Sequence, residues 1–168
     1  INHLGDWGTQ FGQLIVAYKK WGSENAHKTY TVTDLNNLYV RFHQEAEKNP
    51  GLEDEARAWF KKLESGDFEA KDLWQHFKDI SLKEFQKIYD MLGIHFDAFV
   101  GESSYNTMVE DTITRIKEKG LAKVSEQALI IDLEPYNMPP CLLRKKDDTT
   151  LYATRDIAAA EYRKKTYD

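Results

Sequence analysis

Two carboxylates and one phenol are the side chains of this sequence best suited to bind a small cation. Glu102 follows an apolar segment, His95–Val100, that is typical of a strand, and Asp156 lies where a second predicted strand turns into a helix. Ligands of open α/β sheets bind at the carboxyl ends of the strands. Two carboxylates meeting there would suit a guanidinium or ammonium group, because charge-assisted bidentate contacts supply both energy and geometry.

Spacing alone favours plainer roles for these residues. Glu102 can be a solvated loop residue, and Asp156 can be a helix N-cap worth about 1 kcal/mol. Tyr152 lies one helical turn before Asp156. At the end of a strand its ring and hydroxyl would face the same pocket, but a cross-strand aromatic contact in a hairpin explains it equally well. On spacing, both interpretations stay open.

Other common sources of chemistry are missing from the sequence. The five histidines have no HxxxH or HExxH spacing, so we predict no metal site. There is no GxSxG, P-loop or GxGxxG motif, and no catalytic side chain is assigned. The single cysteine, Cys141, stands beside two prolines in a strand pattern and is interpreted as a small buried hydrophobe.

Helical patterns fill the first half of the chain and must position whatever follows. Apolar residues from Phe11 to Tyr18 fall on one helix face, which we expect to end near Gly22. Thr33 is the expected N-cap of a helix that stops before Pro50. The stripe from Leu52 to Leu63 is closed by Gly66. A third stripe follows from Leu73 to Ile80, and Ser81–Glu84 is typical of a capping box that opens a fourth helix ending at Gly93.

After Gly93 the pattern changes from helical to mixed. We predict a strand at His95–Val100, a helix at Met108–Ile116 and a buried strand at Ala128–Leu133. Pro135, Pro139 and Pro140 argue against a helix after that strand. Cys141–Arg144 and Thr150–Thr154 flank a polar turn and predict a hairpin, and Asp156–Lys165 predicts a last helix. The predicted fold class is α/β with an inserted helical block.

Composition narrows the classes of protein further. The 168 residues carry a net charge of −5, with 23 basic and 28 acidic residues. A general phosphate-coating protein would carry a basic surplus instead. The mean hydropathy is −0.65 and no apolar run approaches 18 residues, so we expect no membrane span. One cysteine allows no internal disulfide, and a reducing, intracellular setting is expected. Both chain ends are typical of a segment cut from a longer protein.

Three segments, in order, resemble a known family. They are Asn2–Gly12 (NHLGDWGTQFG), Phe99–Ser103 (FVGES) and Leu151–Ala158 (LYATRDIA), and together they extend over the whole chain. The sequence resembles the arginyl-tRNA synthetases, which are class I aminoacyl-tRNA synthetases.

The resemblance implies part of a Rossmann-type catalytic domain with a large helical insertion. Residues 1–22 would belong to the Rossmann fold, residues 23–92 to the helical insertion and residues 93–102 to a Rossmann strand. Residues 103–150 would form a second insertion, and residues 151–168 would return to the Rossmann portion.

The resemblance also implies the activity. It implies an arginine–tRNA ligase that activates arginine with ATP, accompanied by Mg²⁺, and transfers it to tRNA(Arg). The guanidinium-binding residues carried over by motif are Glu102, Tyr152 and Asp156, which reverses the preference given by spacing. Asp6 and Gln10 would lie near the active-site floor without a firm role. A cytoplasmic location, no membrane contact and a monomeric state are expected.

The same family pattern implies pieces that this sequence lacks. The HIGH motif would precede Ile1, and the KMSKS-type loop would follow Asp168. The fragment alone is therefore expected to be inactive. The alternative is a non-catalytic helical interaction module that keeps a synthetase-like core, and the retained acidic residues Glu102 and Asp156 argue against it.

Overall fold

The computed structural model describes residues 5–22, 30–146 and 148–167, and its chain forms two compact units. The helical unit comprises Asp6–Phe99, and the mixed unit comprises Val100–Asp168 together with the N-terminal residues up to Gly5. Each unit has its own buried residues and is described by itself. No helix in the described ranges is both long and apolar enough to cross a membrane.

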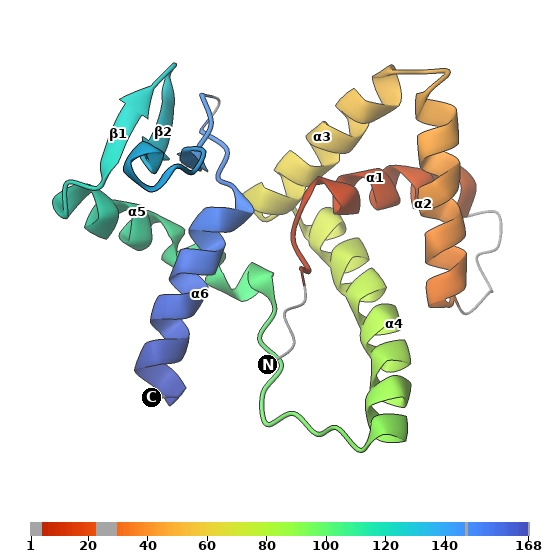
Figure 1. Ribbon diagram of the computed structural model, residues 1–168. Helices are drawn as coiled ribbons and strands as arrows, with labels where there is room; N and C mark the ends of the chain where they lie inside the picture. The colour runs from red at the N-terminus through yellow and green to blue at the C-terminus, as the bar shows by residue number, and fades with distance from the viewer. Residues whose placement is uncertain (1–4, 23–29, 147, 168) are drawn as a thin grey trace. The chain divides into compact units, whose positions relative to one another are not determined.

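The helical unit is built around the first helix. Its elements are α1 (Thr9–Ala17), the π-helix η1 (Tyr18–Gly22), α2 (Val32–Ala46), α3 (Gly51–Ser65) and α4 (Phe68–Leu92). Figure 1 shows α1 among the three longer helices, with α3 packed against it. The buried side chains at its centre come from all four helices: Ile15, Leu35, Phe42, Phe60, Leu63 and Phe77. Burial of this apolar face is what holds the helices together.

Gly12 lets α1 and α3 approach at the level of their backbones. A methyl group at Gly12 would lie 2.1 Å from the carbonyl oxygen of Ala56 and 3.1 Å from the backbone nitrogen of Phe60. Neither neighbour is a flexible side chain that could move aside. The absence of a side chain at Gly12 is therefore required by the packing.

The start of α2 corrects one prediction. Its N-cap is Thr31 and not Thr33: the Thr31 hydroxyl accepts a hydrogen bond from the backbone of Asp34, and the Asp34 carboxylate accepts one from the backbone of Thr31. This reciprocal capping box satisfies two of the amide groups that a helix leaves unpaired at its start. Thr33 lies inside the first turn and is exposed.

α4 corrects a second prediction, because it is one helix of 25 residues and not two. Ser81 does not cap a new helix; its hydroxyl donates to the carbonyl of Phe77 at 2.9 Å, within the same helix. Serine and threonine often bond back to the preceding turn in this way. Phe68–Leu92 contains no glycine or proline that would interrupt the ladder. Gly66 and Gly93, the predicted helix ends, do adopt left-handed backbone with φ of 87° and 64°.

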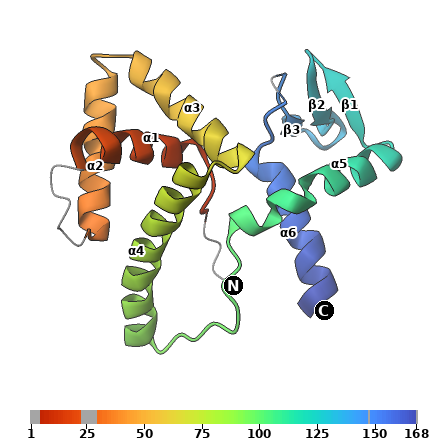
Figure 2. The same cartoon turned by 180° about the vertical axis from the view of Figure 1, so that it is seen from behind.

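The mixed unit combines helices with a small sheet. Its elements are the 3₁₀-helix η3 (Glu102–Met108), α5 (Val109–Glu118), β1 (Ala122–Ser125), β2 (Ala128–Ile131), the 3₁₀ turn η4 (Glu134–Tyr136), β3 (Cys141–Arg144) and α6 (Tyr152–Tyr167). The strands run antiparallel in the order β1-β2-β3. Figure 2 shows this sheet beside α5, with α6 leading away from it.

The predicted strands β2 and β3 are confirmed, whereas β1 is an addition. β1 pairs with β2 across a two-residue turn, and Ser125 faces Ala128 in the register. The turn residues Glu126 and Gln127 both have positive φ, as a tight hairpin requires. Neither is glycine or asparagine, so the usual sequence signal of such a turn is missing.

Two other predicted strands are wrong. His95–Val100 has no regular structure and is mostly exposed, because an apolar run becomes a strand only where another strand pairs with it. Thr150 forms a single antiparallel bridge with Arg144, and the chain enters α6 at Tyr152. The described residues thus contain an antiparallel sheet where parallel Rossmann strands were expected.

Candidate functional site

Glu102 is a buried carboxylate whose partner is Arg155. Glu102 is the first residue of η3, and Arg155 lies in the first turn of α6. The Arg155 Nε donates to Glu102 Oε1 at 2.6 Å, and the two side chains are only 7% and 8% exposed. A buried charge requires a close counter-charge, and this ion pair supplies it.

The first turn of α6 is fixed by a second buried contact. The Thr154 hydroxyl donates to the carbonyl of Leu143 in β3 at 2.7 Å. The Arg155 Nη1 also lies 3.4 Å from the hydroxyl of Thr150, just before the helix. Together with the Glu102 pair, these bonds fasten the start of α6 to both the sheet and η3.

The other oxygen of Glu102, Oε2, lies near Gly5. A methyl group on Gly5 would lie 3.4 Å from Glu102 Oε2, which is ordinary van der Waals contact. Because Gly5 has no side chain, no side-chain atom of that residue covers Oε2. The backbone at Gly5 therefore borders the Glu102 carboxylate.

Tyr152 and Asp156 flank Arg155 at the start of α6, but unlike Arg155 they are exposed to solvent. Residues four apart share a helix face, so Tyr152 and Asp156 are neighbours on α6. Tyr152 is 67% exposed, and Asp156 is exposed as well. The structure thus brings Tyr152 and Asp156 together and ties Glu102 to the same turn through Arg155. The enclosed cavity shared by all three stays a prediction.

Arg155 is the residue that the sequence interpretation missed. It stands between Thr154 and Asp156 in the segment that carries the family resemblance. With Glu102 and Asp156 it gives the cluster two negative charges and one positive charge. The signal for Arg155 was indirect: a carboxylate that becomes buried needs a basic partner.

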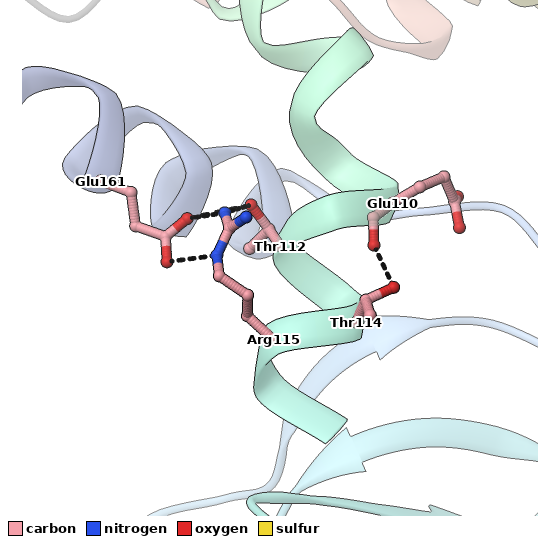
Figure 3. A network of polar contacts seen from close by, with 5 residues as sticks. All are labelled: Glu110, Thr112, Thr114, Arg115 and Glu161. Atoms are coloured by element: carbon pink, nitrogen blue, oxygen red, sulfur yellow. Dashed lines mark hydrogen bonds and ion pairs between the residues drawn. The ribbon is translucent and has the colours of Figure 1, made fainter. Parts of the chain in front are cut away.

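A second polar network holds α6 to α5 farther along the helix. Figure 3 shows Arg115 and Thr112 of α5 both donating to the carboxylate of Glu161. The hydrogen bond from Arg115 lowers the pKa of the Glu161 carboxyl, and the same bond raises the pKa of Arg115. Both side chains are more than a third exposed, so solvent screens the pair and its net contribution to stability is small.

The two remaining candidates, Asp6 and Gln10, belong to the helical unit. Asp6 is buried, and its carboxylate forms an ion pair with Lys78 at 2.8 Å. The backbone carbonyl of Asp6 accepts a hydrogen bond from the Trp74 indole at 2.7 Å. These contacts fasten the segment before α1 to α4. Gln10 is exposed in the first turn of α1. Their placement on an active-site floor stays a prediction.

Metal binding finds no support in the side chains that the structure places. Across residues 5–22, 30–146 and 148–167, no group of three or more His, Cys, Asp or Glu could hold a metal ion. The Mg²⁺ that accompanies ATP stays a prediction, and no chemical step on this chain is assigned to that ion.

Comparison with known proteins identifies the class. All 168 residues match the family of class I arginyl-tRNA synthetases, catalytic domain. The chain belongs to this family of class I aminoacyl-tRNA synthetases, and the resemblance predicted from three short segments is confirmed.

Individual relatives agree with the family. The chain is 60% identical over 168 residues to an arginine–tRNA ligase of Enterococcus faecalis and 58% identical to one of Exiguobacterium sp.. All of this chain is covered, but only 30% of each relative. A crystal structure of arginyl-tRNA synthetase from Plasmodium falciparum matches 96% of this chain and 27% of its own, with 30% identity and a TM-score of 0.79. The chain thus spans about a third of the length of its relatives.

Proposed function

We propose that this chain is the arginine-binding part of the catalytic domain of an arginine–tRNA ligase. The proposed reaction joins arginine to tRNA(Arg) with ATP as the energy source. One observation carries the proposal: over its whole length, the chain is about 60% identical in sequence to proteins named for this activity. Identity at that level over a whole segment favours a shared substrate as well as a shared fold.

In this proposal Glu102 and Asp156 bind the guanidinium group of arginine. A guanidinium offers five N–H donors in one plane and suits two carboxylates that approach from different sides. Asp156 would approach from the exposed face of α6, and Glu102 would approach from η3. Tyr152, one turn before Asp156 on the same face, would add its hydroxyl and the flat face of its ring.

Arginine selection follows from charge and geometry together. A lysine side chain would bring a positive charge, but its ammonium is a point donor that cannot form two parallel contacts. Citrulline would keep the planar shape and lose the positive charge. We therefore expect both analogues to be rejected.

The finer architecture is also part of the proposal. We place these residues in a Rossmann-type catalytic domain, with residues 23–92 as its helical insertion. The sheet described above is antiparallel, and the sequence has no P-loop or GxGxxG motif, so we place the binding of ATP and its accompanying Mg²⁺ chiefly in other parts of a longer protein. A cytoplasmic, monomeric ligase is the corresponding expectation.

A segment exchange tests this function. The 168 residues would replace their counterpart in the full-length ligase of Enterococcus faecalis, and ATP–pyrophosphate exchange would be measured with tRNA(Arg) present. We expect exchange that depends on arginine and not on lysine or citrulline. The unmodified ligase is the positive control, and the 168 residues alone are expected to be inactive. A folded chimera without arginine-dependent exchange would instead support the non-catalytic interaction module.

A further inference from the structure

Arg155, which has no assigned role, contacts only one of the two carboxylate oxygens of Glu102. Arg155 engages Oε1 of Glu102 through Nε, while its Nη1 is directed to Thr150. An arginine that served only to neutralise a carboxylate could place two nitrogens on both oxygens. Here the guanidinium nitrogens of Arg155 contact two different residues. The second carboxylate oxygen of Glu102, Oε2, lies on the side of Gly5.

We propose that Arg155 is a positioning residue for the substrate arginine. By holding Oε1, it fixes the rotamer of Glu102 and directs Oε2 toward the ligand. Its positive charge also offsets the negative charge of the Glu102 carboxylate. This inference rests on the proposed function, because it assumes that Glu102 meets the guanidinium group.

The position of Arg155 supports an indirect role. Its Nε and Nη1 are directed to Glu102 and Thr150, and its positive charge would repel a guanidinium group, so direct contact with the ligand is left to Glu102, Tyr152 and Asp156. The start of α6 is already fastened by Thr154 to Leu143. The Arg155 bond goes instead to the Glu102 carboxylate in η3, so its loss would act first on that carboxylate.

A double-mutant cycle in the chimeric ligase tests whether Arg155 acts through Glu102. The variants are Arg155→Gln, Glu102→Gln and the combination of both, with KM measured separately for arginine and for ATP. We expect Arg155→Gln to raise the KM for arginine about tenfold or more and to leave the KM for ATP within about twofold. In the Glu102→Gln background, Arg155→Gln should add less than about twofold, because the residue it positions is already altered.

Two further variants separate positioning from folding. Arg155→Lys keeps the positive charge but lacks the planar guanidinium. Its KM for arginine should therefore lie between those of the unmodified chimera and Arg155→Gln. Arg115→Gln breaks the half-exposed α5–α6 pair and serves as the matched control; it should leave the KM for arginine unchanged. Thermal unfolding of each variant shows which ones are folded. If Arg155→Gln does not fold, the comparison of Arg155→Lys with unmodified chimera decides the question.

The inference is overturned if Arg155→Gln raises both KM values alike, or if its effect on arginine is the same with and without Glu102. An unchanged KM for arginine in folded Arg155→Lys and Arg155→Gln would overturn it as well. Failure of the proposed function would look different: the chimera with the unmodified segment would show no arginine-dependent exchange at all.

Discussion

Arg155 and Glu102 form a buried ion pair, with Nε and Oε1 2.6 Å apart, although 53 residues separate them in the sequence. The pair joins the first turn of α6 to the first residue of η3. Tyr152 lies on that first turn and Asp156 directly follows it, so the pair ties Glu102 to the segment that carries the other two proposed arginine-binding residues. The order of the site therefore depends on a residue outside the proposed binding set.

Gly12→Ala should destabilise the helical unit. The added methyl group would meet the Ala56 carbonyl, so α1 and α3 would have to separate. We expect the free energy of unfolding to fall by about 1–3 kcal/mol, measured by urea denaturation. Gly51→Ala is the matched control, because its nearest new neighbour is the amide oxygen of Asn49, an exposed side chain. Equal stability of the two variants would contradict the close packing of α1 on α3.

Thr31→Ala should weaken α2, whereas Thr33→Ala should not. Thr31 forms the capping box with Asp34, and loss of such a cap costs about 1 kcal/mol. Thr33 is an exposed residue of the first turn, where alanine is the better helix former. Chemical denaturation of both variants measures the difference. A larger loss for Thr33→Ala would return the N-cap to the position predicted from sequence.

The Glu161–Arg115 network should make the attachment of α6 dependent on pH. The pKa of Glu161 is lowered in the folded protein by the hydrogen bond from Arg115. A carboxyl with a lowered folded pKa stabilises the protein above its unfolded pKa, and this contribution is lost as pH falls through the folded value. Glu161→Gln should therefore be less stable than the unmodified protein at pH 7, and the gap should close at acidic pH.

Thermal unfolding at a series of pH values measures that gap. Added salt should shrink it at neutral pH, because both side chains are more than a third exposed and screening reaches them. A gap that widens toward low pH would contradict the assignment of Glu161 as the charged partner.

Local sequence signals predicted the structure correctly where a single residue determines the backbone conformation. Gly66 and Gly93 end α3 and α4 as predicted, because glycine adopts the left-handed conformation at a helix end without strain. The apolar stripe from Leu52 to Leu63 likewise identified the buried face of α3, since that face repeats with the helical period.

Signals that depend on a distant partner were not enough. His95–Val100 has strand composition but no pairing strand, and Ser81 has a capping-box neighbour but bonds back to Phe77. Tyr152 was predicted to lie in a strand at Thr150–Thr154, yet it begins α6. Arg155 was missed for the same reason: nothing nearby in the sequence shows that Glu102 becomes buried against it.

The central claim is that Asp156 and Glu102 bind the guanidinium group of arginine. The most direct measurement is the KM for arginine and for ATP in the chimeric ligase carrying Asp156→Asn, with the exposed α5 residue Asp111→Asn as control. We predict a rise in the KM for arginine of about tenfold or more, equivalent to about 1.4 kcal/mol, with the KM for ATP within about twofold and the control unchanged. Equal changes in both KM values, or no change for arginine, would contradict the claim.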